Sequence, residues 1–429
     1  MHWERFVGAL AAVTLTAAVT AAQSPPSSTF DDLIRLALER NQQYLASKER
    51  LTEATAMARQ AGLRPAPTFE AETGIGAIVG SRGEAEYSAA YFQTIERGGK
   101  REKRLAVAEK GIALAQAELQ EVERQLAFDV KIRAIAVLSQ ESKLVSTRTL
   151  LVTNQEGHRL AAQRVGLGDI APLEEQLLLA EVNRTQAQIV SIDAAREASL
   201  AELRGVVGAP PAQPIGPVSE FKVAGQEPRL DQLQSYALQH RPDLRVLQLL
   251  EDQASAELDL VAAESRPDLT ASARYTRSSS RFDQLGLSET GERVPLRDTD
   301  NIVTFGLSIP LFTKNRAQPA IDASRSRQTQ QRLRREYLAR AIPQEVEAAY
   351  RRWIGSMRSL EILRTGVLEP SQKSLTVVRE AYRLGQLRLL DVLNEQRRIA
   401  DLQLSLVDAQ ADVDRALVDL ERAIGGNLP

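Results

Sequence analysis

Residues 85–101 read AEYSAAYFQTIERGGKR, and the pattern of the chain changes within this stretch. Its first part alternates, since Ala85, Tyr87, Ala89 and Tyr91 are separated by Glu86, Ser88 and Ala90. A period of two with one polar face predicts a β-strand. After Gly98 the chain continues to about Arg164 without a proline, which predicts one helix roughly 100 Å long.

Three further stretches alternate in the same way. The residues that share the mainly apolar face are Phe69, Ala71, Thr73, Ile75, Ala77 and Val79; Leu269, Ala271, Ala273 and Tyr275; and Val303, Phe305, Leu307, Ile309 and Leu311. We expect the first pair of strands to turn through 80–83 and the second pair to be joined by a long polar loop, about 279–298.

The strands have about the length of membrane-crossing strands, roughly 9 to 11 residues. Four strands are too few to close a barrel, and an open sheet edge cannot lie in lipid. If the strands cross a membrane, several chains must therefore pool them. The alternative is an ordinary half-buried hairpin in a water-soluble protein.

The chain contains two copies of one unit. Residues 33–38 (LIRLAL) match 233–238 (LQSYAL), and Arg64-Pro65 matches Arg266-Pro267. We expect a first repeat over 23–208, a Pro-rich connector over 209–229 and a second repeat over 230–429. Each repeat reads helix, β-hairpin, long helix, turn and helix. In the first repeat the flanking helices cover about Asp31–Leu63 and Pro172–Val207.

The N-terminus has the pattern of a secretory signal peptide. Arg5 precedes an uncharged run over 6–22, which ends in the small residues Thr20-Ala21-Ala22. We therefore predict a signal peptide over 1–22, with a membrane anchor as the alternative. We find no later run of 18 apolar residues and expect the mature protein to leave the cytoplasm.

Composition excludes several classes of function. The 429 residues include 54 Lys+Arg and 56 Asp+Glu, so the net charge of −2 gives no overall attraction to nucleic acid. Cysteine is absent, and neither His158 nor His240 has a neighbour that suggests a metal site. Residues 97–101 (RGGKR) lack the spacing of a phosphate-binding loop. We expect no enzyme activity, no cofactor and no resident metal.

Two turns between long helices contain glycine, which lets a helix reverse its direction. They cover 164–170 (RVGLGDI) and 383–388 (RLGQLR), and both contain Arg, an apolar residue and Gly in succession. Apolar residues at an exposed tip suggest a partner, and a plain helical hairpin is the alternative.

With these features together, the chain resembles the TolC-like family of bacterial outer-membrane efflux proteins. The resemblance rests on the duplicated plan, the junctions 93–101 and 309–312 (IPLF), and both glycine tips. The Gly99-Lys100-Arg101 junction is most similar to the heavy-metal, CzcC-like branch. Asn394 stands where some members carry a second acidic residue.

The resemblance implies a mostly α-helical chain with a small β part. Three chains would form a 12-stranded outer-membrane β-barrel, continued by a periplasmic α-helical barrel. The function implied is a passive conduit that exports small molecules or metal cations. The partners implied are an inner-membrane pump of the RND type and a periplasmic adaptor, also called a membrane fusion protein. A periplasmic coiled-coil adaptor and the channel of a type I protein secretion system are the alternatives.

The resemblance also assigns roles to residues. The adaptor-docking tips would be Arg164, Val165, Gly166, Leu167, Arg383, Leu384 and Gly385. The gate or constriction would include Tyr382, Arg388 and Asp391.

Overall fold

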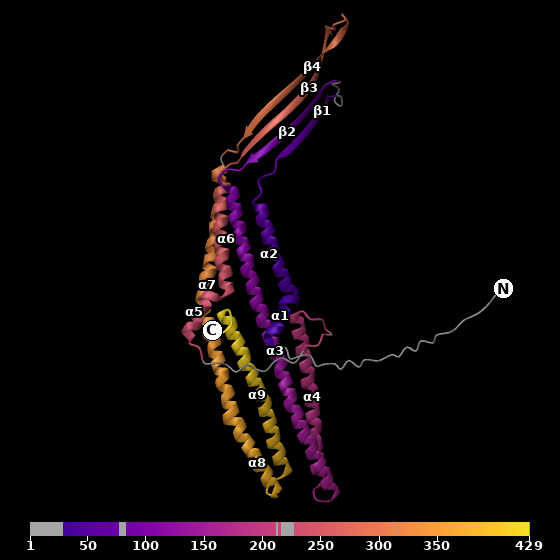
Figure 1. Ribbon diagram of the computed structural model, residues 1–429, viewed down its shortest axis with the longest axis vertical. Helices are drawn as coiled ribbons and strands as arrows, with labels where there is room; N and C mark the ends of the chain where they lie inside the picture. Colours follow the sequence, from indigo (N-terminus) through magenta and orange to yellow (C-terminus); the bar gives the residue numbers. More distant parts are fainter. Residues whose placement is uncertain (1–28, 77–82, 212, 216–226, 312, 429) are drawn as a thin grey trace, which may run out of the picture.

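The computed structural model describes residues 29–76, 83–211, 213–215, 227–311 and 313–428. The chain is elongated, with a β-sheet at one end and long helices that run away from it (Figure 1). The predicted signal peptide, most of the predicted turn at 80–83 and Phe312 lie outside the described residues.

Helices and strands follow the same order in both halves of the chain. The first half contains α1 (Phe30–Arg40), α2 (Gln42–Ala61), β1 (Thr68–Ile75), β2 (Ala85–Ile95), α3 (Lys100–Gly166) and α4 (Pro172–Val207). The second half contains α5 (Leu230–His240), α6 (Pro242–Glu264), β3 (Leu269–Leu287), β4 (Arg293–Ser308), α7 (Thr313–Glu361), the π-helical segment η2 (Ile362–Leu368), α8 (Glu369–Arg383) and α9 (Leu389–Ile424).

The helix predicted over Asp31–Leu63 is wrong in one respect, because it is two helices. Asn41 has an extended conformation with ψ of 116°, which ends α1. Its side-chain oxygen accepts hydrogen bonds from the backbone N–H groups of Gln43 and Tyr44, at 3.0 Å each, and so caps α2. The equivalent helix of the second half is interrupted at Arg241, because the following Pro242 disfavours the helical conformation in the residue before it.

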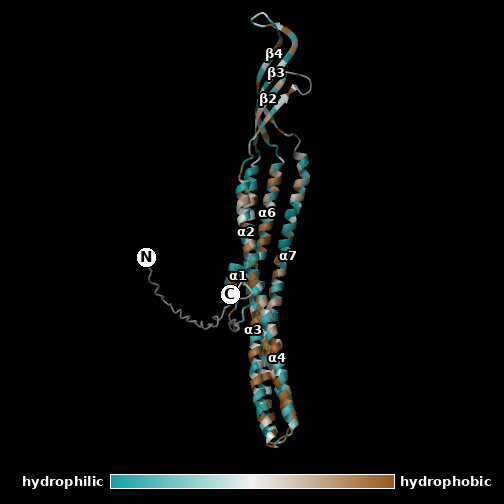
Figure 2. Cartoon of the chain, turned by 90° about the vertical axis from the view of Figure 1, so that its right-hand side faces the viewer, coloured by the Kyte–Doolittle hydropathy of each residue, from teal (hydrophilic) through white to brown (hydrophobic). Residues whose placement is uncertain are grey.

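The sheet has four antiparallel strands in the order β1-β2-β3-β4. Its register places Phe69, Tyr91, Ala273 and Phe305 side by side across the strands, on one apolar face. On the other face the Arg274 guanidinium donates to Glu72 Oε2 at 2.9 Å and to Ser88 Oγ at 3.0 Å. The two faces predicted from the alternation are therefore confirmed within β1–β4. Ile309 and Leu311 follow the end of β4, and Ala77 and Val79 lie outside the described residues. Figure 2 shows hydrophobic and hydrophilic residues interleaved along the strands.

The long polar loop predicted between the last two strands is wrong. Most of 279–298 belongs to β3 and β4, whose ladder continues through pairs such as Ser280 with Asp298. Backbone groups pair whatever the side chains are, so polar residues concealed the strands. The β3–β4 hairpin consequently extends well past the β1–β2 hairpin (Figure 1).

The 67-residue helix α3 is the central element of the helical part. Helices α2 and α4 pack against it, one beside its first part and the other beside its second part (Figure 1). The prediction of one long helix flanked by two shorter ones is thus confirmed. Equivalent residues of the two repeats fill the cores, since Leu33 and Ala37 are buried, as are Leu233 and Ala237.

Helices α7 and α8 follow one another through η2. The π-helical turn lies just before Pro370, which cannot donate a helical hydrogen bond and would crowd the carbonyl four residues earlier. Among the residues that the structure describes, no helix combines the length and the apolar character needed to cross a membrane.

Candidate functional site: the ends of the two helical hairpins

Both helical hairpins end in the same backbone motif. After α3, the Asp169 N–H donates to the Arg164 carbonyl at 2.9 Å, and Gly168 has φ of +79°. After α8, the Gln386 N–H donates to the Ala381 carbonyl at 2.9 Å, and Gly385 has φ of +75°. This six-to-one hydrogen bond with a left-handed glycine is the Schellman motif.

The motif changes the correspondence between the two tips that the sequence suggested. The first turn reverses at Gly168 and not at Gly166, so Gly168 matches Gly385 and Leu167 matches Leu384. The side chains of Leu167 and Leu384 are 77% and 63% exposed. Each tip therefore presents one exposed leucine directly before its glycine.

Tyr382 links the two hairpins within one chain. Its hydroxyl donates to Glu174 Oε2, at the start of α4, with a distance of 2.9 Å. Burial and the Glu174 carboxylate raise the pKa of the Tyr382 hydroxyl, while Arg164 nearby works in the opposite direction. Two predicted site residues, Tyr382 and Arg164, are thus brought together with a residue that sequence reasoning missed.

A second link lies further along the same helices. The Glu181 carboxylate of α4 is only 3% exposed and accepts hydrogen bonds from Arg397 of α9 and from Arg184. Burial alone would raise the pKa of Glu181, but the hydrogen bonds from Arg397 and Arg184 outweigh it and lower the pKa. Glu181 and Arg397 carried no signal in the sequence, because helix-borne Glu and Arg are abundant and these two lie 216 positions apart.

Asp391 lies in the first turn of α9. Its Oδ2 accepts a hydrogen bond from the Arg388 backbone N–H at 3.0 Å, and its side chain is exposed. In the described residues of the single chain, no Arg side chain pairs with Asp391, and Arg383 instead pairs with Glu380 at 2.7 Å. One chain thus shows the capping contact of Asp391.

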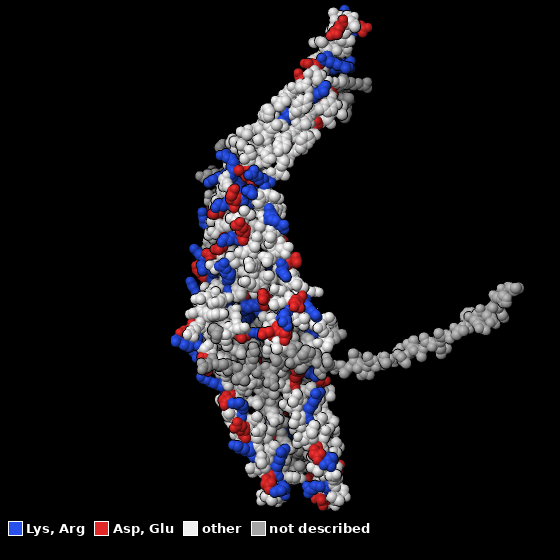
Figure 3. All heavy atoms as spheres, in the orientation of Figure 1, with Lys and Arg blue, Asp and Glu red and all other residues white. Residues whose placement is uncertain are grey.

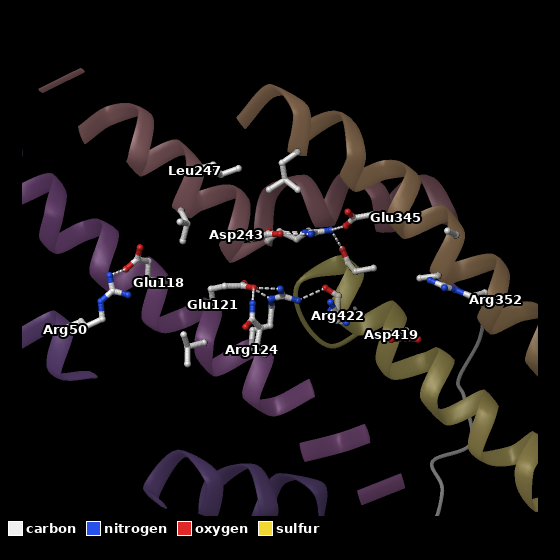
Figure 4. A pocket seen from close by; sticks show the side chains of 18 residues that line it. Arg50, Glu118, Glu121, Arg124, Asp243, Leu247, Glu345, Arg352, Asp419 and Arg422 are labelled. Carbon is white, nitrogen blue, oxygen red and sulfur yellow. Dashed lines mark hydrogen bonds and ion pairs between the residues drawn. The ribbon is translucent and has the colours of Figure 1, made fainter. Parts of the chain in front are cut away.

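A cavity between the helices has a structural role. It measures about 870 Å³ and lies among α3, α6, α7 and α9 (Figure 4). Buried Arg241 pairs there with Asp243 at 2.6 Å and with Glu345 at 2.5 Å, which ties the α5–α6 break to α7. Among the described residues, no group of three or more His, Asp or Glu side chains is arranged to hold a metal ion.

Known proteins share this sequence pattern and this fold. The family described as "Outer membrane efflux protein" matches residues 233–426. The cobalt-zinc-cadmium resistance protein CzcC of Cupriavidus metallidurans is 24% identical over 77% of this chain and 75% of its own length. The outer membrane efflux protein BepC of Brucella suis is 25% identical over 69% of this chain and 60% of its own length.

Solved structures extend the likeness to nearly the whole chain. CusC superposes with a TM-score of 0.73 over 94% of this chain and 93% of its own, at 17% identity. The outer-membrane channel OprN gives a TM-score of 0.72 over 93% and 90%, also at 17% identity. At such identities the structures establish the shared fold.

The fold and the family match define a class, the TolC-like outer-membrane efflux channels, and the resemblance inferred from the sequence is confirmed. The similarity to these proteins supports an outer-membrane efflux channel that spans the periplasm. The similarity to these proteins implies the partners of a tripartite efflux system, which are an adaptor and an inner-membrane pump.

Proposed function

We propose that three copies of the chain form the conduit. The observation that carries this proposal is the open four-stranded sheet with one apolar face. Within the described residues, the order of its strands leaves β1 and β4 each with an edge that no other strand covers. Unpaired backbone groups are unfavourable in lipid, so β4 of one copy would pair with β1 of the next and twelve strands would close.

Membrane fractionation and size measurement test this assembly. We expect the mature protein in the outer-membrane fraction, as a detergent-stable particle with the mass of three chains, which conducts ions in planar bilayers. A folded, water-soluble monomer that persists without detergent would contradict the proposal.

The sequence pattern also suggests how the precursor is organised. We propose removal of residues 1–22 as a signal peptide, and a duplicated mature chain with repeats over 23–208 and 230–429 and a connector over 209–229. N-terminal sequencing of the protein from the outer membrane tests the cleavage position.

The ends of the hairpins are the proposed docking and gating region. The exposed leucines and the neighbouring residues Arg164, Val165, Gly166, Arg383 and Gly385 would contact the adaptor. The bonds Tyr382–Glu174 and Arg397–Glu181 support a gate, because they hold α4 against the second hairpin. Charge-assisted hydrogen bonds suit a gate, since they are directional and can be exchanged. Around a threefold axis, three copies of Asp391 and Arg388 would complete the constriction.

The cargo proposed is metal cations or small molecules, delivered by an RND-type pump. The support for metal cations is the similarity to CzcC, whose name links it to cobalt, zinc and cadmium resistance. Deleting the gene and measuring growth at graded concentrations of these metals and of organic toxicants would distinguish the two classes. If the deletion strain is sensitive neither to the metals nor to the organic toxicants, both proposed classes of cargo are contradicted.

A further inference from the structure

We propose that Arg277, Arg281 and Arg297 form a site for the phosphate groups of the outer-leaflet glycolipid. We call these three residues the arginine patch. The inference rests on the conduit proposed under Proposed function, taken with its helices in the periplasm. The patch lies on β3 and β4, towards the end of the sheet that is far from the helices (Figure 1).

The register places the arginine patch on the apolar, outward face. Arg277 is opposite Tyr87 on β2 and Asn301 on β4, and Arg281 is opposite Arg297. These positions continue the row that contains Tyr275 and Val303, because side chains two residues apart share a face. The Tyr275 hydroxyl donates to Asn301 Oδ1 at 2.7 Å, which confirms that this row extends beyond the apolar residues.

Within the part of the chain that the structure describes, the arginine patch has no counter-charge. Among the described residues, no carboxylate lies within ion-pairing distance of its three side chains, all of which are exposed. Like charges directly opposite each other on neighbouring strands destabilise a sheet, yet Arg281 and Arg297 are such a pair. On the other side of Arg281, its aliphatic stem lies beside Gly83, where a Cβ would be 3.2 Å from Arg281 Cδ. An external anion would resolve this repulsion.

Acidic residues of the same strands lie on the opposite face. Asp298 is opposite Ser280, and Asp300 is opposite Ser278, both in the row that contains Arg274. Glu72 lies on that face too, as its hydrogen bond with Arg274 shows. Positive charge at this level therefore faces outward and negative charge faces the interior of the proposed barrel, so that only the outer surface attracts an anion.

The height of the arginine patch fits the phosphate layer. From Leu269, at the start of β3, Arg277 is eight residues away, which is roughly 20 Å of height for a strand tilted by about 40°. Arg281 is roughly 30 Å high by the same measure. The apolar band of such barrels is about 25 Å tall, so the patch spans its outer limit. Figure 3 shows the uncharged surface of the strands bounded by charged side chains at this end.

Phosphate is the anion that this arrangement favours. Arginine matches phosphate oxygens with two parallel N–H donors, and several arginines close together suit a lipid with more than one phosphate. The outer leaflet of a bacterial outer membrane consists of such a phosphorylated glycolipid, while phospholipids with a single phosphodiester occupy the inner leaflet. We therefore commit to the outer-leaflet glycolipid.

The test measures binding of diphosphoryl lipid A to the purified, detergent-solubilised trimer by native mass spectrometry. The variant is the triple substitution R277Q/R281Q/R297Q. The matched control is R148Q/R340Q/R358Q, which removes the same charge from three exposed arginines of α3 and α7 that pair with no carboxylate in the described structure. Phosphatidylglycerol serves as the comparison lipid for every protein.

We expect the dissociation constant for diphosphoryl lipid A to rise by about fivefold for each arginine removed from the patch. The control should bind like the wild type. The proposal is overturned if the patch variant binds as tightly as the wild type, if the control weakens equally, or if phosphatidylglycerol binds as well as diphosphoryl lipid A. Single-channel conductance of the same samples separates the two proposals, because loss of a conducting trimer in the wild type would refute the conduit and not the patch.

Discussion

At the scale of the residue, Asp414 is the most unusual ionisable group of the helical part. Its side chain is 6% exposed on α9, and its Oδ2 has no hydrogen-bond partner in the described structure. Burial raises the pKa of Asp414 from its ordinary value of 3.8 to about 7, although a hydrogen bond with Gln410 works in the opposite direction. Helix α9 carries Asp414 close to Ala411 and Val418, which pack with Ile135 of α3.

The raised pKa of Asp414 predicts a pH-dependent stability. The folded chain holds this proton more tightly than the unfolded chain, so the contribution is complete below about pH 4 and is lost as the pH rises through about 7. The difference is at most about 4 kcal/mol. We expect Asp414→Asn to remove this dependence and to raise the melting temperature at pH 8, measured by circular dichroism of the detergent-solubilised protein. An equal pH dependence in wild type and variant would refute the assignment.

Asp391 predicts a change in the channel at rest. Removing its carboxylate with Asp391→Ala loses a helix-capping hydrogen bond worth about 1 kcal/mol. If three copies also close the constriction, we expect a higher resting conductance and a weaker preference for cations in planar bilayers. An intact trimer with unchanged conductance and selectivity would leave Asp391 only the capping role that the single chain shows.

At the scale of the element, the two Schellman motifs explain why the tips look alike. The sequence placed an Arg, an apolar residue and a glycine at both turns, but hydrogen bonding chose Gly168 in the first. A pattern of residue types cannot choose between Gly166 and Gly168, because both glycines permit the reversal. The positive φ of Gly168 identifies it as the residue at which the first turn reverses, and this aligns Leu167 with Leu384.

This alignment predicts which tip residues matter most for docking. Leu167→Asp and Leu384→Asp should each weaken binding to the adaptor by tenfold or more, on the order of 1.4 kcal/mol, since both side chains are exposed and apolar. The control is Gln386→Asp, because Gln386 is exposed and lies beside the second tip. Ile170 is partly buried and is therefore unsuitable as a control position. Site-specific crosslinking to the adaptor measures the effect. Equal crosslinking of all variants would mean that the tips are only turns.

The break between α1 and α2 depends on a close approach to the end of α4. Gly208 has φ of +73°, and a Cβ at that position would lie 2.8 Å from the Arg40 carbonyl oxygen. We expect Gly208→Ala to destabilise the chain by about 2 kcal/mol or more, because both the left-handed backbone and the clash are unfavourable. Gly205→Ala is the control, since nothing lies within 4 Å of its Cβ. Thermal unfolding of the two variants should therefore differ.

At the scale of the whole molecule, the sheet and the helices present different kinds of surface. The sheet exposes an apolar face that water does not favour, while the helices cover their surface with charges of both signs (Figure 3). Phe305 and Leu307 are among the most exposed large apolar residues. In the proposed conduit the outer membrane would cover this face, and the charged helices would lie outside the bilayer.

The apolar face predicts a strong effect of a single charge. Leu307→Arg should cost about 2–4 kcal/mol if the residue lies near the middle of the bilayer. Ser308→Arg, on the opposite face of the same strand, is the matched control and should insert normally. The amount of heat-resistant trimer in outer-membrane fractions measures both. Normal insertion of Leu307→Arg would place this face away from lipid.

The sequence by itself determined most of the element types, the duplication and the two faces of the sheet, because alternation, proline-free length and matched segments are local properties. It missed the ends of β3 and β4 and the break at Asn41. It also led to the family and to both glycine turns. Only the tertiary structure decided the Tyr382–Glu174 and Arg397–Glu181 links, which join residues more than 200 positions apart. The same holds for the register that sets Arg281 opposite Arg297. Such contacts depend on how helices and strands align in space, and no local pattern of residues encodes that alignment.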